Sequence, residues 1–311
     1  MTFVEKLRKT KSHLKSSSVD TYLRNIKRLR KVFHELPIPD TENKWLVSKK
    51  LFTWFDKQKL GIRRHLATAA IVALKVYKTE NEEWKKRSSK AMHEFDDDRR
   101  KRTLNDKQKK AMPSKGFDSL KRVVSNLKKE FKHILDTKNT EWSLSDLVRV
   151  QELIIISLYY EYPLRLDYAD LKTTKSEKEN CIYKNLKKPR GYHIQLLEYK
   201  TSKSLGKRIF KLNAANQRLL NKFVPAVIRL TDHGFLLTNR SGRKMTKQVL
   251  SKTLMTITKK RIGKTFSVQL LRILFAMKNR DVLETAKEVS SKLLHSQEQS
   301  LQYAKKDVKK V

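Results

Sequence analysis

The shortage of glycine and proline is the feature that most limits what this chain can fold into. Only 7 Gly and 6 Pro occur among 311 residues. All-β folds need many such residues at their tight turns, so this composition argues against an all-β fold. Apolar residues instead recur at helical spacing, as Tyr22, Ile26, Leu29 and Phe33 do. A mainly helical chain is therefore expected.

The first 80 residues are predicted to form a small helical domain. A Ser-rich segment at 16–20 can cap a helix over residues 21–33, and Pro37 and Pro39 end that helix. Further helices are expected at 48–58 and 62–77. The last of these is almost uncharged in its middle, so we expect it to be the buried one.

Residues 81–116 are predicted to form a charged linker, because acidic and basic runs dominate and apolar residues are few. The early part of this segment can extend a helix, and the rest is expected to be an exposed connector. Three consecutive carboxylates, Asp96 to Asp98, could be considered as metal ligands. They stand beside a run of Arg and Lys in a polar stretch, so we interpret them as solvated.

Residues 117–311 are predicted to form a second domain, mainly helical with a small antiparallel β-hairpin sheet. Its two strands are expected at 192–199 and 208–212, joined by a turn that contains Ser and Gly. The expected helices are near 117–135, 144–160, 214–229, 247–260, 268–278, 282–294 and 297–306.

The charge of the chain indicates its partner. Lys and Arg number 72 against 32 Asp and Glu, a net charge of +40, and such a field attracts polyanions, above all nucleic acid. Apolar residues still make up 38 %, enough for a folded protein.

A single cysteine, Cys181, fits a reducing compartment. No run is long enough to span a bilayer and no secretory signal is visible, so we expect an intracellular protein with no membrane partner.

Two arginines lie in very apolar segments of the second half. Arg165 follows the apolar run 153–160, and Arg272 interrupts the apolar stretch 266–276. A guanidinium in such surroundings requires an anion. For Arg165 a structural ion pair with Asp167 or Asp170 is as good an explanation as a bound phosphate, and Arg272 can equally reach solvent from its helix face.

Lysine, histidine and tyrosine residues join the two arginines as candidate catalytic residues. Lys200 and Lys203 lie on the turn between the predicted strands, where a lysine is either solvated or able to protonate a leaving oxygen. His295 follows Arg272 by 23 positions, and Tyr303 lies eight residues further on. A tyrosine near a C-terminus is, taken alone, most often a packing residue.

In chain order the set is Arg, Lys, Arg, His, Tyr, behind a basic helical domain. This order resembles the tyrosine recombinase (phage-type integrase) family. Residues about 10–110 resemble its core-binding domain, and about 117–306 its catalytic domain. The interval from Arg272 to His295, the Leu-Leu-His-Ser sequence at 293–296 and a predicted strand at 235–239 before Met245-Thr246 are similar to the family. The segments around Arg165 and Lys200 resemble integrases of large DNA viruses and their mobile parasites.

Two features depart from the family pattern. Gln269 stands where the family usually has His, and Gln can donate a hydrogen bond but cannot shuttle a proton at neutral pH. The interval from His295 to Tyr303 is one residue shorter than usual, which in a helix is about 100° of rotation.

The resemblance implies a mechanism without a metal or other cofactor. Tyr303 would attack a DNA phosphate, forming a 3′-phosphotyrosyl bond, while Arg165 and Arg272 hold the phosphoryl oxygens. Lys200, or alternatively Lys203, would protonate the leaving 5′-oxygen. His295 would bond the phosphoryl group or help to deprotonate Tyr303. Gln269 would be an auxiliary donor.

The implied partner is double-stranded DNA, bound by a homo-tetramer on synapsed sites, for integration of a viral or mobile genome in the host nucleus or in a viral factory in the cytoplasm. Alternatives are a catalytically weakened or inactive DNA-binding protein on the same fold, a type IB topoisomerase-like enzyme, and a generic basic structural protein. The expected DNA contacts are Arg24, Lys27, Arg28, Lys31 and Lys247.

Overall fold

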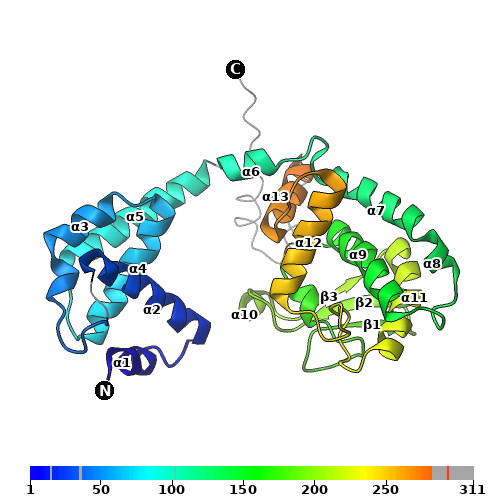
Figure 1. Cartoon of the computed structure of the whole chain (residues 1–311), viewed down its shortest axis with the longest axis horizontal. Helices are drawn as coiled ribbons and strands as arrows, with labels where there is room; N and C mark the ends of the chain where they lie inside the picture. The colour runs from blue at the N-terminus through cyan, green and yellow to red at the C-terminus, as the bar shows by residue number, and fades with distance from the viewer. Residues whose placement is uncertain (15, 35–36, 102, 282–292, 294–311) are drawn as a thin grey trace. The chain divides into compact units, whose positions relative to one another are not determined.

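The computed structural model describes residues 1–281 and 293, except 15, 35–36 and 102. The chain divides into two compact units, Met1–Lys101 and Arg102–Val311, each with its own hydrophobic core (Figure 1). It is mainly helical with a small antiparallel sheet, so the predicted fold class is confirmed.

All the regular elements described in the first unit are helices. Its elements are α1 (Phe3–Thr10), α2 (Ser16–Arg30), η1 (Lys31–Phe33), η2 (Lys44–Val47), α3 (Lys49–Asp56), α4 (Leu60–Val76) and α5 (Glu82–Arg100). The centre of the unit is α4, which buries a stretch rich in alanine, as its lack of charge predicted. Small side chains let α2 and α5 approach α4 closely.

Helix α5 occupies most of the segment expected to be a charged linker. It begins at the N-cap Asn81, whose side chain accepts a hydrogen bond from the Trp84 amide. The Trp84 side chain is fully buried against Phe52 and Phe55, and its Nε1 donates to the Leu46 carbonyl at 2.7 Å. One large aromatic residue thus attaches a highly charged helix to the first unit.

The second unit is built around α9, a long apolar helix. Its helices are α6 (Asp106–Ala111), η3 (Gly116–Asp118), α7 (Ser119–Glu130), α8 (Lys132–Asp136), α9 (Leu144–Glu161), η4 (Asp167–Asp170), α10 (Ser202–Leu205), α11 (Ala214–Leu230), α12 (Lys247–Ile262) and α13 (Val268–Lys278). Both α7 and α11 pack against α9, and α12 also contacts it (Figure 1).

The sheet has three strands in the order β1 (Cys181–Asn185), β2 (Gly191–Leu196) and β3 (Arg208–Lys211), all antiparallel. The two predicted strands correspond to β2 and β3, and β1 is an addition. The expected turn between β2 and β3 contains the short helix α10, which ends at Gly206 with φ of 64°. The strand expected at 235–239 is reduced to isolated bridges at Phe235 and Thr238.

The helices expected at 282–294 and 297–306 lie outside the described residues, apart from Leu293, and so do His295 and Tyr303. Among the helices that the structure describes, none is both long and apolar enough to cross a bilayer.

Candidate active site

Arg272 lies in the middle of α13 and is almost completely buried, with 2 % of its surface exposed. Its guanidinium donates two hydrogen bonds to main-chain carbonyls, Nη1 to Pro163 at 2.9 Å and Nη2 to Leu293 at 2.6 Å. Pro163 lies two residues before Arg165, and Leu293 two residues before His295. One side chain therefore brings three of the predicted segments to the same place.

The loop that carries Arg165 is anchored to the end of α9. The Tyr159 hydroxyl donates to the Arg165 carbonyl at 2.8 Å. The Tyr168 hydroxyl lies 2.7 Å from the Tyr162 carbonyl and 3.0 Å from that of Leu158. Both tyrosine rings are buried and meet edge to face. The backbone at Arg165 is therefore held from both sides, while its side chain is half-exposed.

Asp167 is the buried carboxylate beside these arginines, with 7 % of its surface exposed. Burial raises its pKa, and the positive charges of Lys247, Arg165 and Arg272 lower it by less. Its Oδ2 accepts no hydrogen bond from the residues that the structure describes. Asp167 thus marks a point within electrostatic reach of both predicted catalytic arginines.

The turn that carries Lys200 and Lys203 lies near the same point. Tyr199 is buried just before it, and its hydroxyl donates to the Gly206 carbonyl at 2.6 Å. Burial raises the pKa of Tyr199, and the charge of Asp167 contributes to the rise. Lys200 and Lys203 are both exposed, so the described geometry does not choose between them as the acid.

Gln269 lies one helical turn before Arg272 on α13 and is exposed. It therefore shares a face with the buried arginine, as the expected role of an auxiliary donor requires. The remaining predicted residues, His295 and Tyr303, lie outside the described part of the chain.

A group of charges at the start of α12 was only partly foreseen. Lys247, a predicted DNA contact, lies 2.6 Å from an oxygen of Asp170, and Lys244 lies 3.1 Å from the other oxygen. Lys244 was not singled out from the sequence, although it stands just before a predicted helix start. Asp170 was considered as a partner of Arg165, and in the structure its oxygens meet these two lysines.

The other predicted DNA contacts lie in the first unit on one exposed face. The described surface of α2 and η1 carries Arg24, Lys27, Arg28 and Lys31, while Ile26 and Leu29 on the opposite face are fully buried. The amphipathic pattern of this helix is confirmed. Its basic face is positioned to meet a polyanion.

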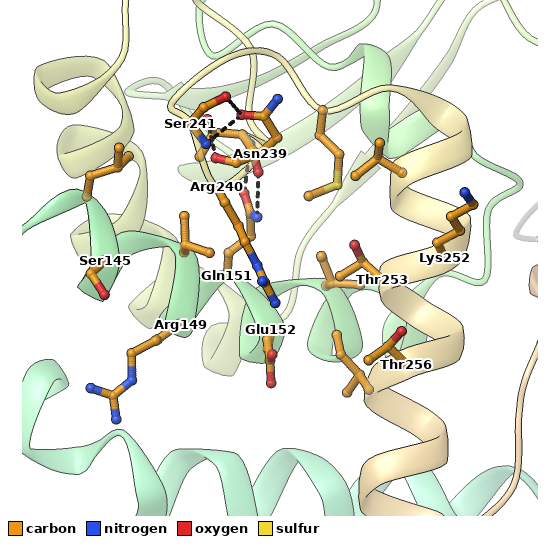
Figure 2. Close-up of a pocket in the computed structure, with 17 residues that line it drawn as sticks. Ser145, Arg149, Gln151, Glu152, Asn239, Arg240, Ser241, Lys252, Thr253 and Thr256 are labelled. Atoms are coloured by element: carbon orange, nitrogen blue, oxygen red, sulfur yellow. Dashed lines mark hydrogen bonds between the residues drawn. The ribbon is translucent and has the colours of Figure 1, made fainter.

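A pocket of about 800 Å³ lies elsewhere in the second unit, between α9, α12 and the turn at 238–241. Gln151 holds the turn by two 2.8 Å hydrogen bonds with the Thr238 backbone. Arg240 extends across the pocket toward Glu152 (Figure 2). None of the predicted site residues that the structure describes lines this pocket.

The three consecutive carboxylates interpreted as solvated lie on α5. Asp96 and Asp97 are within 4.0 Å and 3.5 Å of Arg99 and Arg100 respectively. Among the described residues, no three His, Cys, Asp or Glu side chains are grouped closely enough to hold a metal ion.

Comparison with solved structures identifies the fold. The XerH site-specific recombinase bound to difH substrate, in a pre-cleavage complex, matches 94 % of this chain and 76 % of its own length with 15 % identity and a TM-score of 0.59. The same protein with a palindromic difH substrate, after cleavage, matches 94 % and 77 % with 14 % identity and a TM-score of 0.56. The chain therefore has the fold of the tyrosine recombinases. No model of a protein family matches the sequence, and no curated protein matches it.

Proposed function

We propose that this protein is a site-specific DNA recombinase that cuts and rejoins DNA through Tyr303. The observation that carries the proposal is the hydrogen bonding of Arg272, whose guanidinium joins the segment before Arg165 to the segment before His295. A charged group fixed in this way is pre-oriented, and a pre-oriented charge stabilises a phosphoryl transition state without reorganising. The fold, and the DNA bound in both XerH structures, support the same proposal.

The proposed reaction is a transfer of one phosphodiester bond. The Tyr303 oxygen bonds to phosphorus and the bond to the 5′-oxygen breaks, which leaves a 3′-phosphotyrosyl link. The Tyr303 proton passes to His295 or water, and Lys200 or Lys203 supplies a proton to the leaving 5′-oxygen. Arg165 and Arg272 hold the non-bridging oxygens, and Gln269 donates a further hydrogen bond.

The biological setting that we propose is integration of a viral or mobile genome by a homo-tetramer on two double-stranded DNA sites, inside the host cell. The covalent intermediate conserves the energy of the broken bond, so strands can be exchanged and resealed without ATP. The net charge of +40 supplies the phosphate affinity that such an assembly needs.

Covalent trapping tests the proposal. The protein is incubated with a nicked suicide duplex built from the ends of its parent element, and denaturing gels compare it with Tyr303→Phe. We expect a DNA-sized shift that the Phe variant lacks. Salt-sensitive binding without an adduct on several candidate ends would favour the inactive alternative, and Gln269→His would then be examined for recovery of cleavage. Relaxation of any supercoiled plasmid, irrespective of sequence, would favour the topoisomerase-like alternative.

A further inference from the structure

The ion cluster formed by Asp170, Lys244 and Lys247 joins two parts of the second unit. Asp170 is the last residue of η4, the short helix that begins at Asp167. Lys247 is the first residue of α12, and Lys244 lies three residues before it. Asp170 Oδ1 lies 3.1 Å from Lys244 Nζ, and Oδ2 lies 2.6 Å from Lys247 Nζ. Each carboxylate oxygen therefore has an ammonium of its own.

Neighbouring parts of the structure fix the positions of Lys244 and Lys247. Lys244 Nζ lies 3.8 Å from the centroid of the Phe235 ring, a cation–π contact that orients it. Lys247 is the first residue of α12, whose N-cap Thr246 accepts a hydrogen bond from the Val249 amide. The positive end of a helix dipole favours an anion at this place. The cluster is thus a preformed anion site whose occupant in this structure is an internal carboxylate.

The pKa of Asp170 shows how strongly the lysines hold it. Burial raises this pKa, yet hydrogen bonds from Lys247 and Lys244 and their charges lower it by more, so that the net shift is downward. Asp167, three residues earlier, shows the opposite shift. Asp170 is therefore ionised at neutral pH, and the cluster of two lysines and one carboxylate has a net charge of +1.

The exposure of these side chains argues against a purely structural role for the two ion pairs. The side chains of Lys244, Lys247 and Asp170 are 37 %, 51 % and 35 % exposed. Ion pairs this exposed contribute little to folding stability, because water screens them. The same exposure leaves the two ammonium groups accessible to an external anion with two oxygens, which is the chemistry of a phosphodiester.

The position of the cluster links it to the candidate active site. Lys247 acts on the pKa of Asp167, as Arg165 and Arg272 do, so all three cations lie near one buried carboxylate. We propose that Lys244 and Lys247 bind a DNA backbone phosphate next to the one held by the arginines, and that Asp170 occupies this site until the phosphate displaces it. The inference rests on the proposed function, because the ligand is the phosphate backbone of DNA.

In this view Asp170 is a positioning residue that keeps the lysines paired and lowers the affinity for any DNA. The test is binding of a fluorescent duplex of arbitrary sequence over a series of salt concentrations. Asp170→Asn changes the charge of the cluster from +1 to +2. We expect it to bind roughly threefold more tightly, because the phosphate no longer has to displace a carboxylate, while the slope of log K against log salt stays the same, since the same phosphate is neutralised. The gain should be equal on unrelated duplexes, because phosphate contacts carry no sequence information.

The matched control is Asp118→Asn. Asp118 also pairs with one lysine, Lys278, in the second unit, so the control removes the same charge away from the cluster. We expect this control to change the affinity much less than Asp170→Asn does. Asp170→Glu, which keeps the carboxylate, should behave as wild type, and adding Lys247→Gln to Asp170→Asn should cancel the gain.

Each result of these binding measurements either supports or overturns the proposed phosphate site. Weaker or unchanged binding by a folded Asp170→Asn variant would overturn the inference and leave Asp170 a structural residue. If Asp170→Asn does not fold, Lys247→Gln in the wild-type background decides, since the inference requires its slope to fall by about 0.9 and a structural pair requires no change. Failure of the wild type to bind any duplex would instead overturn the proposed function.

Discussion

The two units use their basic residues in opposite ways. In the first, α2 and η1 expose four basic side chains above a buried apolar face. In the second, Arg272 is buried and its guanidinium is fixed by two carbonyls from distant segments. An exposed cation adds affinity for any phosphate that comes near. A buried and oriented cation can act on one phosphate in one geometry, at the cost of desolvation. The comparison distinguishes exposed cations from a buried, oriented one, and the proposed roles in affinity and in chemistry depend on that difference.

The largest expected effect that tests this comparison is that of Arg272→Lys. Lysine keeps the charge but cannot donate to Pro163 and Leu293 with one planar group. We expect covalent adduct formation to fall by about 10²- to 10³-fold, as for loss of an oriented donor, while duplex affinity changes little. Denaturing gels measure the first and fluorescence anisotropy the second. Equal losses in both measurements would show that Arg272 serves affinity after all.

The converse variant neutralises the exposed basic face of α2 and η1, with Arg24, Lys27, Arg28 and Lys31 all changed to Gln. Each lost phosphate contact reduces the salt slope by about 0.9, so we expect a decrease of up to roughly 3 to 4 and a large loss of affinity at moderate salt. Adduct formation at saturating protein should remain close to wild type. Changing four exposed lysines of α5 and α6 (Lys85, Lys86, Lys109 and Lys110) provides a charge-matched control, and an equal effect there would deny α2 a special role.

A smaller effect is expected for Tyr159→Phe, which removes only the hydroxyl that donates to the Arg165 carbonyl. The lost hydrogen bond should lower the free energy of unfolding by about 1 kcal/mol, measured by urea denaturation. Because the bond holds the backbone at Arg165, adduct formation should fall further than duplex binding. A change in stability with unaltered cleavage would mean that other contacts suffice to position Arg165.

The smallest effect is expected from Asp167→Asn and depends on pH. Burial raises the pKa of Asp167, so the folded protein binds this proton more tightly than the unfolded chain does. The cost of the buried charge is absent below the ordinary carboxyl pKa and grows as the pH rises toward the raised value. Asp167→Asn should therefore gain in melting temperature over wild type as the pH rises above about 4, the ordinary carboxyl pKa. A gain that shrinks with rising pH would contradict the direction of the shift.

Most helices could be predicted from the sequence because each buries one stripe or one uncharged run, as α2, α4 and α9 do. The segment of α5 could not be recognised in this way. Its buried side chains are only Trp84 and Ala91, so its apolar content is that of a linker, and packing against α4 decides its structure. The strand β1 is short and polar at its end, and only pairing with β2 makes it a strand.

For the candidate site, the sequence by itself determined which chemical groups are present and in which order, because side-chain type and spacing are local properties. It supplied Arg165, Lys200, Arg272, His295 and Tyr303 as a hypothesis. Only the tertiary structure decided which groups meet. Arg272 donates to carbonyls at positions 163 and 293, and Asp170 faces Lys244 and Lys247 across more than 70 positions of chain. Contacts between distant segments follow from how helices pack around α9, and no local pattern encodes them.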